Sequence, residues 1–144
     1  MNTTSYRPVL SASDIEAIAS AANAAANTQE GAEFSIAIVD ASGYLLHFER
    51  QLNAPLFSIT LAQDKAYTAA TTARNTGVWA DILEQESVVA HGLAALPRFA
   101  PLPGGQPLAI EGYVVGAVGI SGGHWSQDDA VASAAVAASD GNRE

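Results

Sequence analysis

The stretch Gly112-Tyr113-Val114-Val115-Gly116-Ala117-Val118-Gly119-Ile120-Ser121-Gly122-Gly123 decides the fold of this chain. Its valine, isoleucine and tyrosine residues favour a β-strand over residues 113–121. Gly116 and Gly119 inside that strand indicate a bulge or a close approach of another backbone. Residues 107–111 enter the same strand across a glycine turn, which predicts an antiparallel hairpin. The stretch lacks the G-x-G-x-x-G spacing of a dinucleotide site.

A second hairpin is predicted upstream of this one. Residues 34–39 form a β-branched apolar run, and residues 44–49 continue in an extended pattern. The turn between them is Asp40-Ala41-Ser42-Gly43. Both strands are mostly apolar on both faces, which is typical of a sheet covered by helices.

Two alanine-rich helices are predicted around the first hairpin. One spans residues 13–26, where Ser13 and Glu16 have the spacing of a capping box. The other follows Pro55 and spans residues 56–74, with a stripe of small residues at helical spacing. The members of that stripe are Ile59, Ala62, Ala66, Ala69 and Ala73.

The rest of the chain adds a short helix over residues 77–86 and a final helix after the second hairpin. Ser126 is the expected N-cap of that final helix, with Asp129 three residues further on. Residues 91–106 are predicted to be a long, proline-rich functional loop. The order α-ββ-α-α-ββ-α predicts one α/β (α+β) domain over residues 1–144, with an antiparallel sheet from two hairpins flanked by helices.

Composition excludes several classes of function. The 144 residues include 15 acidic and only 6 basic side chains, for a formal charge of −9. Binding to nucleic acid or to an anionic membrane needs a basic patch, so neither is expected. Cysteine is absent, which excludes disulfides, thiolate catalysis and cysteine-ligated metals. We expect no dedicated metal site, because no H-E-x-x-H or i, i+4 histidine pair occurs.

The low charge density also bears on assembly and location. Charged residues make up 15% of the chain, against about 25% in an average globular protein. Such a surface predicts that part of it is covered by another subunit, as in a homo-oligomer. The N-terminus has no signal-peptide pattern, and no apolar run reaches membrane-spanning length. We therefore expect a cytoplasmic protein.

Lys65 is the only lysine and lies at the edge of the alanine stripe. One interpretation is a surface lysine whose stem covers apolar area. The other is a functional amine, which either anchors an anion or transfers protons with a lowered pKa.

Two glycine loops are candidate ligand sites. They are Gly104-Gly105 and Ser121-Gly122-Gly123, and the second leads directly into a helix. Backbone N–H groups at such a place bind carboxylates or phosphates. The alternative is that both loops are simply tight turns.

The three histidines and Arg50 complete the candidate residues. His47 is expected to face Glu49 along one side of its strand, and His91 precedes a glycine at a helix end. His124, beside Trp125 in the glycine loop, is the best placed for a ligand contact. Arg50 either pairs with Asp40 across the first hairpin or binds a ligand.

Several segments together resemble a known family. They are Ser35–Asp40 followed by Gly43, Phe48 and Arg50; Asp64–Ala69; Pro103–Pro107; and Gly112–Gly123 followed by Gln127 and Asp128. In this order and spacing they resemble the GlcG/HbpS family, or haem-degrading domain family, which includes the C-terminal domain of PduO-type proteins. The resemblance covers about residues 11–139.

The resemblance implies a profilin-like sandwich and homo-oligomers of two or more subunits. Some members of the family bind haem, with a histidine near the first helix supporting iron ligation, whereas this chain has no histidine before His47. The positions that match the family imply a pocket for a small acidic or carbonyl compound. They are Lys65, Gly104, Gly105, Ser121, Gly122, Gly123 and Asp128.

Three hypotheses about function follow. The first is binding of haem or another tetrapyrrole, with His47, His91 or His124 as the axial ligand. The second is a cofactor-independent isomerase or lyase, in which Lys65, His124 and Asp128 move protons. The third is a non-catalytic oligomeric module that binds a small molecule.

Overall fold

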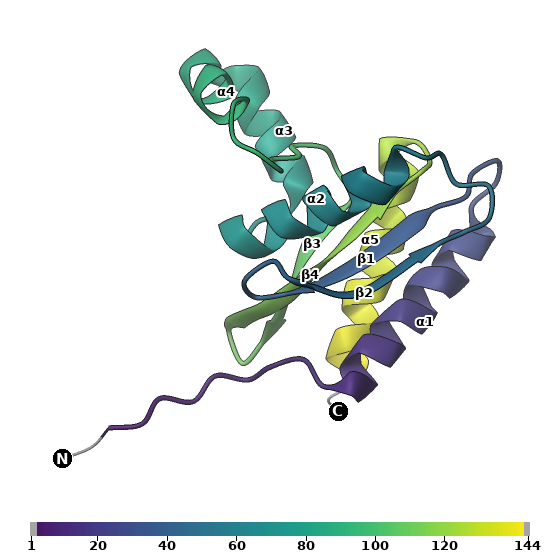
Figure 1. Cartoon of the computed structure of the whole chain (residues 1–144), viewed down its shortest axis with the longest axis vertical. Helices are drawn as coiled ribbons and strands as arrows, with labels where there is room; N and C mark the ends of the chain where they lie inside the picture. The colour runs from purple at the N-terminus through teal and green to yellow at the C-terminus, as the bar shows by residue number, and fades with distance from the viewer. Residues whose placement is uncertain (1–2, 143–144) are drawn as a thin grey trace.

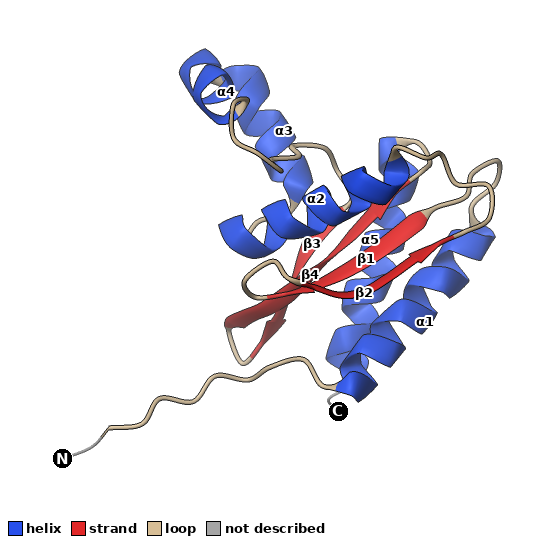
Figure 2. Cartoon of the chain, viewed as in Figure 1, coloured by secondary structure: helices blue, strands red, loops and turns tan. Residues whose placement is uncertain are grey.

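The computed structural model describes residues 3–142 as a four-stranded antiparallel sheet with helices on both faces (Figures 1 and 2). The strand order is β2-β1-β4-β3, so each hairpin forms one half of the sheet and β1 pairs with β4 at its centre. This arrangement confirms the predicted fold class. The elements are α1 (Ala12–Thr28), β1 (Ser35–Asp40), β2 (Leu45–Arg50), α2 (Ser58–Thr72), α3 (Thr76–Gln85), α4 (Ser87–Leu93), β3 (Gly105–Ile110), β4 (Tyr113–Ser121) and α5 (Trp125–Gly141).

The sheet separates two hydrophobic cores. On one face, α1 and α5 lie side by side and cover the large residues of β1, β3 and β4, among them Ile36, Ile38 and Ile120. On the other face, the alanines of α2 pack on Ala37 and Ala117, so this second core is built from small side chains. The predicted stripe Ala62, Ala66 and Ala69 is fully buried there.

Small residues let α2 approach the sheet closely. A Cβ on Gly119 of β4 would lie 2.0 Å from the carbonyl oxygen of Ala62 and 2.6 Å from the amide nitrogen of Ala66. Only glycine fits at this position, because a side chain would overlap the helix backbone. The close backbone approach predicted for this strand is therefore confirmed. The pairing of β3 with β4 also shifts register between Leu108 and Ala109, beside Gly116.

Local details differ from the predictions at the helix ends. The capping box of α1 is formed by Ser11 and Asp14, two residues before the predicted pair, because the amide of Asp14 donates to Ser11 Oγ. The N-cap of α5 is His124 and not Ser126, since the Ser126 amide donates to His124 Nδ1.

The segment after α2 projects from the sheet as a helical arm (Figure 1). Its first helix, α3, was predicted, but α4 occupies residues 87–93, and the predicted long loop over residues 91–106 therefore begins with a helical turn. No residue of α4 is buried. Among residues 3–142, no helix has the length and apolarity needed to cross a membrane.

Candidate functional site

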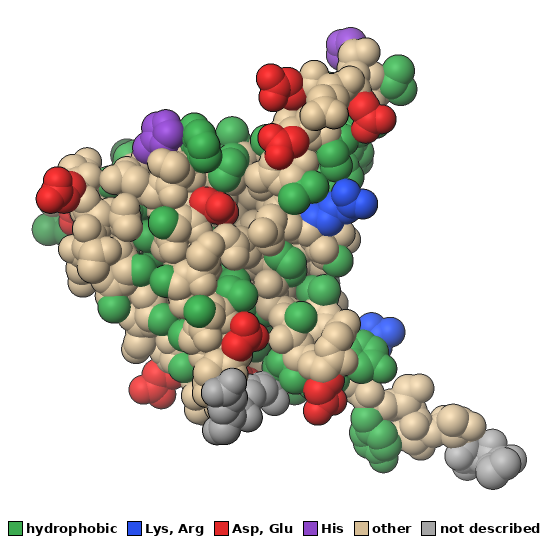
Figure 3. All heavy atoms as spheres, turned by 180° about the vertical axis from the view of Figure 1, so that it is seen from behind, with side chains coloured by type: hydrophobic (Ala, Val, Ile, Leu, Met, Phe, Trp, Pro, Cys, Tyr) green, Lys and Arg blue, Asp and Glu red, His purple; other side chains and the backbone are tan. Residues whose placement is uncertain are grey.

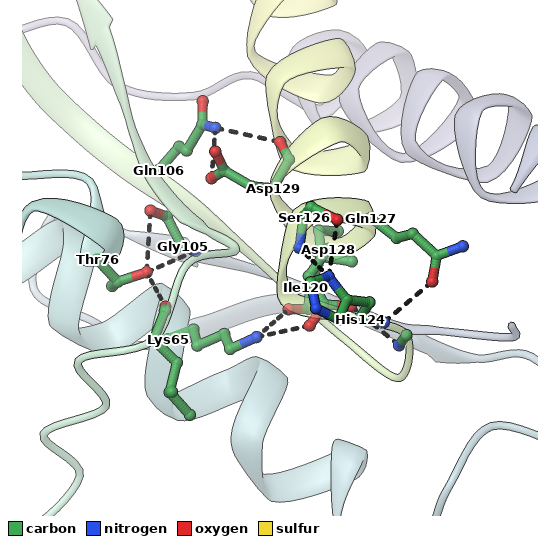
Figure 4. Close-up of polar contacts among 12 residues, drawn as sticks. Lys65, Thr76, Gly105, Gln106, Ile120, His124, Ser126, Gln127, Asp128 and Asp129 are labelled. Atoms are coloured by element: carbon green, nitrogen blue, oxygen red, sulfur yellow. Dashed lines mark hydrogen bonds and ion pairs between the residues drawn. The ribbon is translucent and has the colours of Figure 1, made fainter. Parts of the chain in front are cut away.

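Lys65 is the centre of a buried polar cluster between α2, the end of β4 and the start of α5 (Figure 4). Its Nζ atom donates to Asp128 Oδ2 at 2.9 Å and to the carbonyl oxygen of Ile120 at 2.8 Å. The side chains of Lys65 and Asp128 are only 1% and 5% exposed. The interpretation of Lys65 as a surface lysine is therefore wrong.

Burial perturbs both members of this ion pair. Removal from water lowers the pKa of the Lys65 ammonium, and the negative charge of Asp128 opposes that shift. Burial also raises the pKa of the Asp128 carboxyl, opposed by Lys65 and by the hydrogen bond from the Gly123 amide. Each charge is stabilised mainly by the other, so the pair acts as a unit that connects α2 to α5.

The two glycine loops pack around this ion pair. A Cβ on Gly104 would lie 2.9 Å from Lys65 Nζ, and Gly104 has a positive φ of 121°. A Cβ on Gly105 would lie 2.5 Å from the Lys65 carbonyl oxygen. The Gly105 amide donates to Thr76 Oγ1 at 2.9 Å, and the Gly123 amide donates to Asp128 Oδ1 at 3.0 Å. These two N–H groups are therefore bound by side chains of the chain itself.

The remaining members of the predicted pocket lie at the same end of the sheet. Ser121 ends β4 and is buried. Gly122 has a positive φ of 142°, and a Cβ there would lie 2.1 Å from the Glu33 carbonyl oxygen. His124 is exposed, and its ring lies 5.0 Å from that of Trp125. Lys65, Asp128, His124 and the residues of the two glycine loops thus gather around one corner, where the main visible role of the glycines is close packing.

Arg50 lies apart from this corner and does not pair with Asp40. Its guanidinium donates twice to the carbonyl oxygen of Ala54, at 3.1 and 2.8 Å, and so holds the loop after β2. Asp40 instead accepts hydrogen bonds from the amides of Ser42 and Tyr44 in the hairpin turn. The prediction of an ion pair between Asp40 and Arg50 is therefore wrong.

A separate surface groove contains His47. We call it the α1–β2 groove; it has a volume of about 420 Å³, and its lining includes Ile15, Glu16, Ala19, Asn23, His47 and Glu49. Because His47 pairs with Ile38 of β1, its side chain lies on the sheet face that α1 covers. The sequence pattern did not predict this groove, because α1 and β2 come together only when the chain folds.

His47 has an unusual environment within the groove. Its Nε2 atom is buried and has no hydrogen-bond partner among the described residues. The nearest carboxylate oxygen, Glu49 Oε1, is 3.8 Å away, which is beyond hydrogen-bond distance. Glu49 is itself held by a hydrogen bond from the Asn23 side chain. The predicted proximity of His47 and Glu49 is thus confirmed, and the ring nitrogen is left without a hydrogen bond among the described residues.

His91 lies in the last turn of α4, on the projecting arm. The arm also carries the acidic residues Asp81, Glu84 and Glu86. The three histidines thus lie in three different parts of the fold, and only His47 lines a cavity described above.

Comparison with known proteins places this fold in a family. The family model "Haem degrading protein HbpS-like" matches residues 10–137. The Escherichia coli (strain K12) protein GlcG is 34% identical over 90 residues, which are 60% of this chain and 63% of GlcG. The chain therefore spans less than two thirds of the length of that relative.

Solved structures agree over a larger part of the chain. The PduOC:heme complex superimposes with a TM-score of 0.81 and 30% identity, and the match covers 91% of this chain and 95% of PduOC. A double mutant of HbpS from Streptomyces reticuli gives a TM-score of 0.83 at 30% identity, over 93% of this chain and 89% of HbpS. With a family model that matches nearly the whole described fold, this chain belongs to the HbpS-like family.

Proposed function

We propose that this chain binds haem or another tetrapyrrole in the α1–β2 groove, with His47 as an axial ligand. Membership of the HbpS-like family and the likeness to PduOC, which was crystallised with heme, support this proposal. The single observation that carries it is the buried, unpartnered Nε2 atom of His47. Native proteins rarely leave such an atom unsatisfied, because its desolvation costs about 1–3 kcal/mol.

Glu49 places a carboxylate beside the nitrogen proposed to bind iron. Its Oε1 atom lies 3.8 Å from His47 Nε2, and Asn23 holds the carboxylate there. A negative charge at this place favours a bound iron cation. A bound haem would add a redox-active iron to the groove.

The wall opposite His47 is apolar. It is formed by α1, with Ile15 and Ala19 among its lining residues, and such a surface favours the macrocycle over water. Haem-binding relatives are expected to place a histidine near the first helix, and in this chain His47 faces the same helix from the neighbouring strand. In this chain the residue that binds the iron would therefore come from β2, and not from α1 as expected in the relatives.

The charges of the groove limit how haem would lie. Its lining includes two carboxylates, Glu16 and Glu49, and neither lysine nor arginine. Haem propionates are repelled by these carboxylates, so we expect the propionates to point into solvent. The groove itself has the volume of a small-molecule site and not of one that encloses a whole haem.

The experiment is a titration of the haem-free chain with haem, followed at the Soret band. We expect a saturable spectral change at one haem per chain or less, and its loss in His47→Ala. His91→Ala and His124→Ala are matched controls, since they remove a histidine outside the groove and should titrate like the parent chain. An unchanged titration of His47→Ala would overturn the assignment of the ligand.

The enzyme alternative finds less support. Lys65 and Asp128 are buried and hydrogen-bonded to each other, so neither group faces a substrate in this conformation. His124 remains exposed, but its Nδ1 atom lies 2.8 Å from Ser126 Oγ and caps α5. Gly104, Gly105, Ser121, Gly122 and Gly123 stay predicted ligand contacts of a separate site, since none of them lines the α1–β2 groove.

Assembly into a homo-oligomer is the second part of the proposal. The projecting arm and the loop after it expose Val78, Val88 and Leu96, whose exposed fractions are 42%, 83% and 53%. The face in Figure 3 likewise carries scattered hydrophobic side chains and few basic ones. We expect a mass of at least two chains by light scattering, reduced to one chain in Val88→Glu.

A further inference from the structure

A second cavity lies on the opposite side of the sheet from the α1–β2 groove. It forms where the loop after α4 returns over the outward face of α2, and it has a volume of about 300 Å³. We call it the Arg98 cleft; its lining includes Tyr67, Thr71, Leu96, Pro97, Arg98 and Phe99. Four of its eight lining residues are apolar or aromatic, three are threonines, and Arg98 is the charged one.

Arg98 is held in place by two contacts. Its guanidinium lies over the Tyr67 ring, 4.1 Å from the ring centroid, and its Nε atom donates to Asp64 Oδ1 at 3.2 Å. The side chain nevertheless remains 43% exposed, so it can still receive a ligand. In a chain with six basic residues and a net charge of −9, an arginine fixed beside an aromatic surface is a distinctive feature.

The backbone of Arg98 is also specially held. Its φ is +66°, a left-handed conformation that arginine rarely adopts. The buried side chain of Thr68 stabilises it from both sides, because Thr68 Oγ1 donates to the Arg98 carbonyl at 3.0 Å and accepts from the Ala100 amide at 2.9 Å. A strained residue that its surroundings hold so firmly is often found at a functional site.

We propose that the Arg98 cleft binds a small aromatic monocarboxylate. The carboxylate would pair with the Arg98 guanidinium, whose planar donors match it well. The ring would lie against Phe99 and the edge of Tyr67, whose face Arg98 covers, and such edge contacts are favourable. A volume of about 300 Å³ is at the small end for ligand sites, so a single-ring compound is the size expected.

Asp64 is the internal competitor for this ligand. Its carboxylate already contacts Arg98 and is itself partly exposed, so a ligand must displace an ion pair at the surface. Such exposed pairs contribute little to stability, so a ligand can displace Asp64 from Arg98. Removing the Asp64 charge should strengthen binding of a carboxylate, which a purely structural role for Arg98 does not predict.

The experiment is an NMR titration of the ¹⁵N-labelled full chain with benzoate. The amides of Thr68, Arg98 and Phe99 are the reporters, together with the Trp79 indole N–H, which is hydrogen-bonded to Thr72 and belongs to a ring 5.5 Å from that of Phe99. We expect saturable shifts of these signals with benzoate. Benzamide, which keeps the ring but has no charge, should bind at least about tenfold more weakly.

Variants then assign the binding to Arg98. Arg98→Gln should weaken benzoate binding at least about tenfold, whereas Asp64→Asn should strengthen it several-fold. Arg74→Gln is the matched control, because that arginine lies over Trp79 but does not line the cleft. The same spectra report whether each variant is folded.

The proposal is overturned if benzoate leaves the cleft signals unmoved, or if Arg98→Gln and Asp64→Asn both bind it like the parent chain. It is also overturned if benzoate moves signals of the α1–β2 groove instead. His47→Ala should bind benzoate normally, since His47 lies on the other face of the sheet. A failed haem titration would therefore not change the expected outcome of the benzoate titration.

Discussion

Lys65 Nζ and Asp128 Oδ2 lie 2.9 Å apart inside the protein, and the two residues connect α2 to the first turn of α5. The Lys65 ammonium also donates to the carbonyl oxygen of Ile120 at the end of β4. One side chain of α2 thus binds two other elements, β4 and α5, at the corner where both glycine loops meet. The energetic consequence is that neither charge has another strong partner if its own is removed.

Removal of one member of this pair should be strongly destabilising. We expect Lys65→Met or Asp128→Asn to lower the free energy of unfolding by about 3–5 kcal/mol, because each leaves an uncompensated buried group. The measurement is urea denaturation of each variant. The double variant Lys65→Met/Asp128→Leu should be less destabilised than the sum of the single losses, and strictly additive losses would contradict a coupled pair.

The Asp128→Asn variant should also change how stability depends on pH. Without Asp128, burial lowers the pKa of Lys65 further from its ordinary value of 10.5, because only the weaker attraction of Asp129 still opposes it. The unfolded chain then binds more protons than the folded chain between the two pKa values, so stability rises with pH and is lost as pH falls through the folded pKa.

The matching measurement is the urea concentration at which half of the protein is unfolded, determined at several pH values from about 7 to about 9.5. We expect it to rise for Asp128→Asn and to rise less for Lys65→Met/Asp128→Asn, which lacks the titrating amine. Equal slopes for the two variants would contradict a buried Lys65. In the parent chain, the raised pKa of Asp128 affects stability at acidic pH. Its contribution to the free energy of unfolding is fully present below pH 3.8, the ordinary pKa of the carboxyl, and is lost as pH rises through the pKa of the folded state.

Gly119 tests the close packing of α2 on the sheet. Gly119→Ala should lower stability by about 1–3 kcal/mol or more, since its new methyl group would overlap the backbone of Ala62. Gly92→Ala in α4 is the control, because a Cβ there meets nothing within 4 Å. That change should raise stability by up to about 1 kcal/mol through helix propensity. Thermal unfolding of both variants measures the difference, and a harmless Gly119→Ala would refute the tight contact.

Glu49 tests the environment of His47. Glu49→Gln should weaken haem binding about tenfold or more, because it removes the negative charge beside the nitrogen that would bind the iron cation. Glu16→Gln is the matched control, since it removes a carboxylate from the same groove without a contact to His47. The Soret titration measures both, and equal affinities of the two variants would show that Glu49 has no special role.

Much of the fold was predictable because its signals are local. The β-branched runs of β1 and β4 and the alanine stripe of α2 each follow from a short segment and a fixed period. The helix ends were less predictable, since Ser11 and Ser13 both have a plausible partner three residues further on. Helix α4 has a glycine and two adjacent valines, so its sequence gives no clear helical pattern.

The site was harder to predict because its contacts are distant in sequence. Lys65 and Asp128 are 63 residues apart, and no local pattern pairs them. The family resemblance selected both residues, but it did not show that they bond to each other. The α1–β2 groove was missed for a similar reason, since Asn23 meets Glu49 only after β2 joins the sheet.

Thr68 provides the last prediction, because its hydroxyl holds the loop that carries Arg98. Thr68→Val keeps the shape of the side chain but leaves the Arg98 carbonyl and the Ala100 amide without this partner. We expect a loss of about 1–3 kcal/mol in stability from the unsatisfied groups. Weaker benzoate binding should accompany it, since Arg98 would leave its left-handed conformation. Thr68→Ser keeps the hydroxyl and should retain benzoate binding, so equal binding by the valine and serine variants would separate Thr68 from the Arg98 cleft.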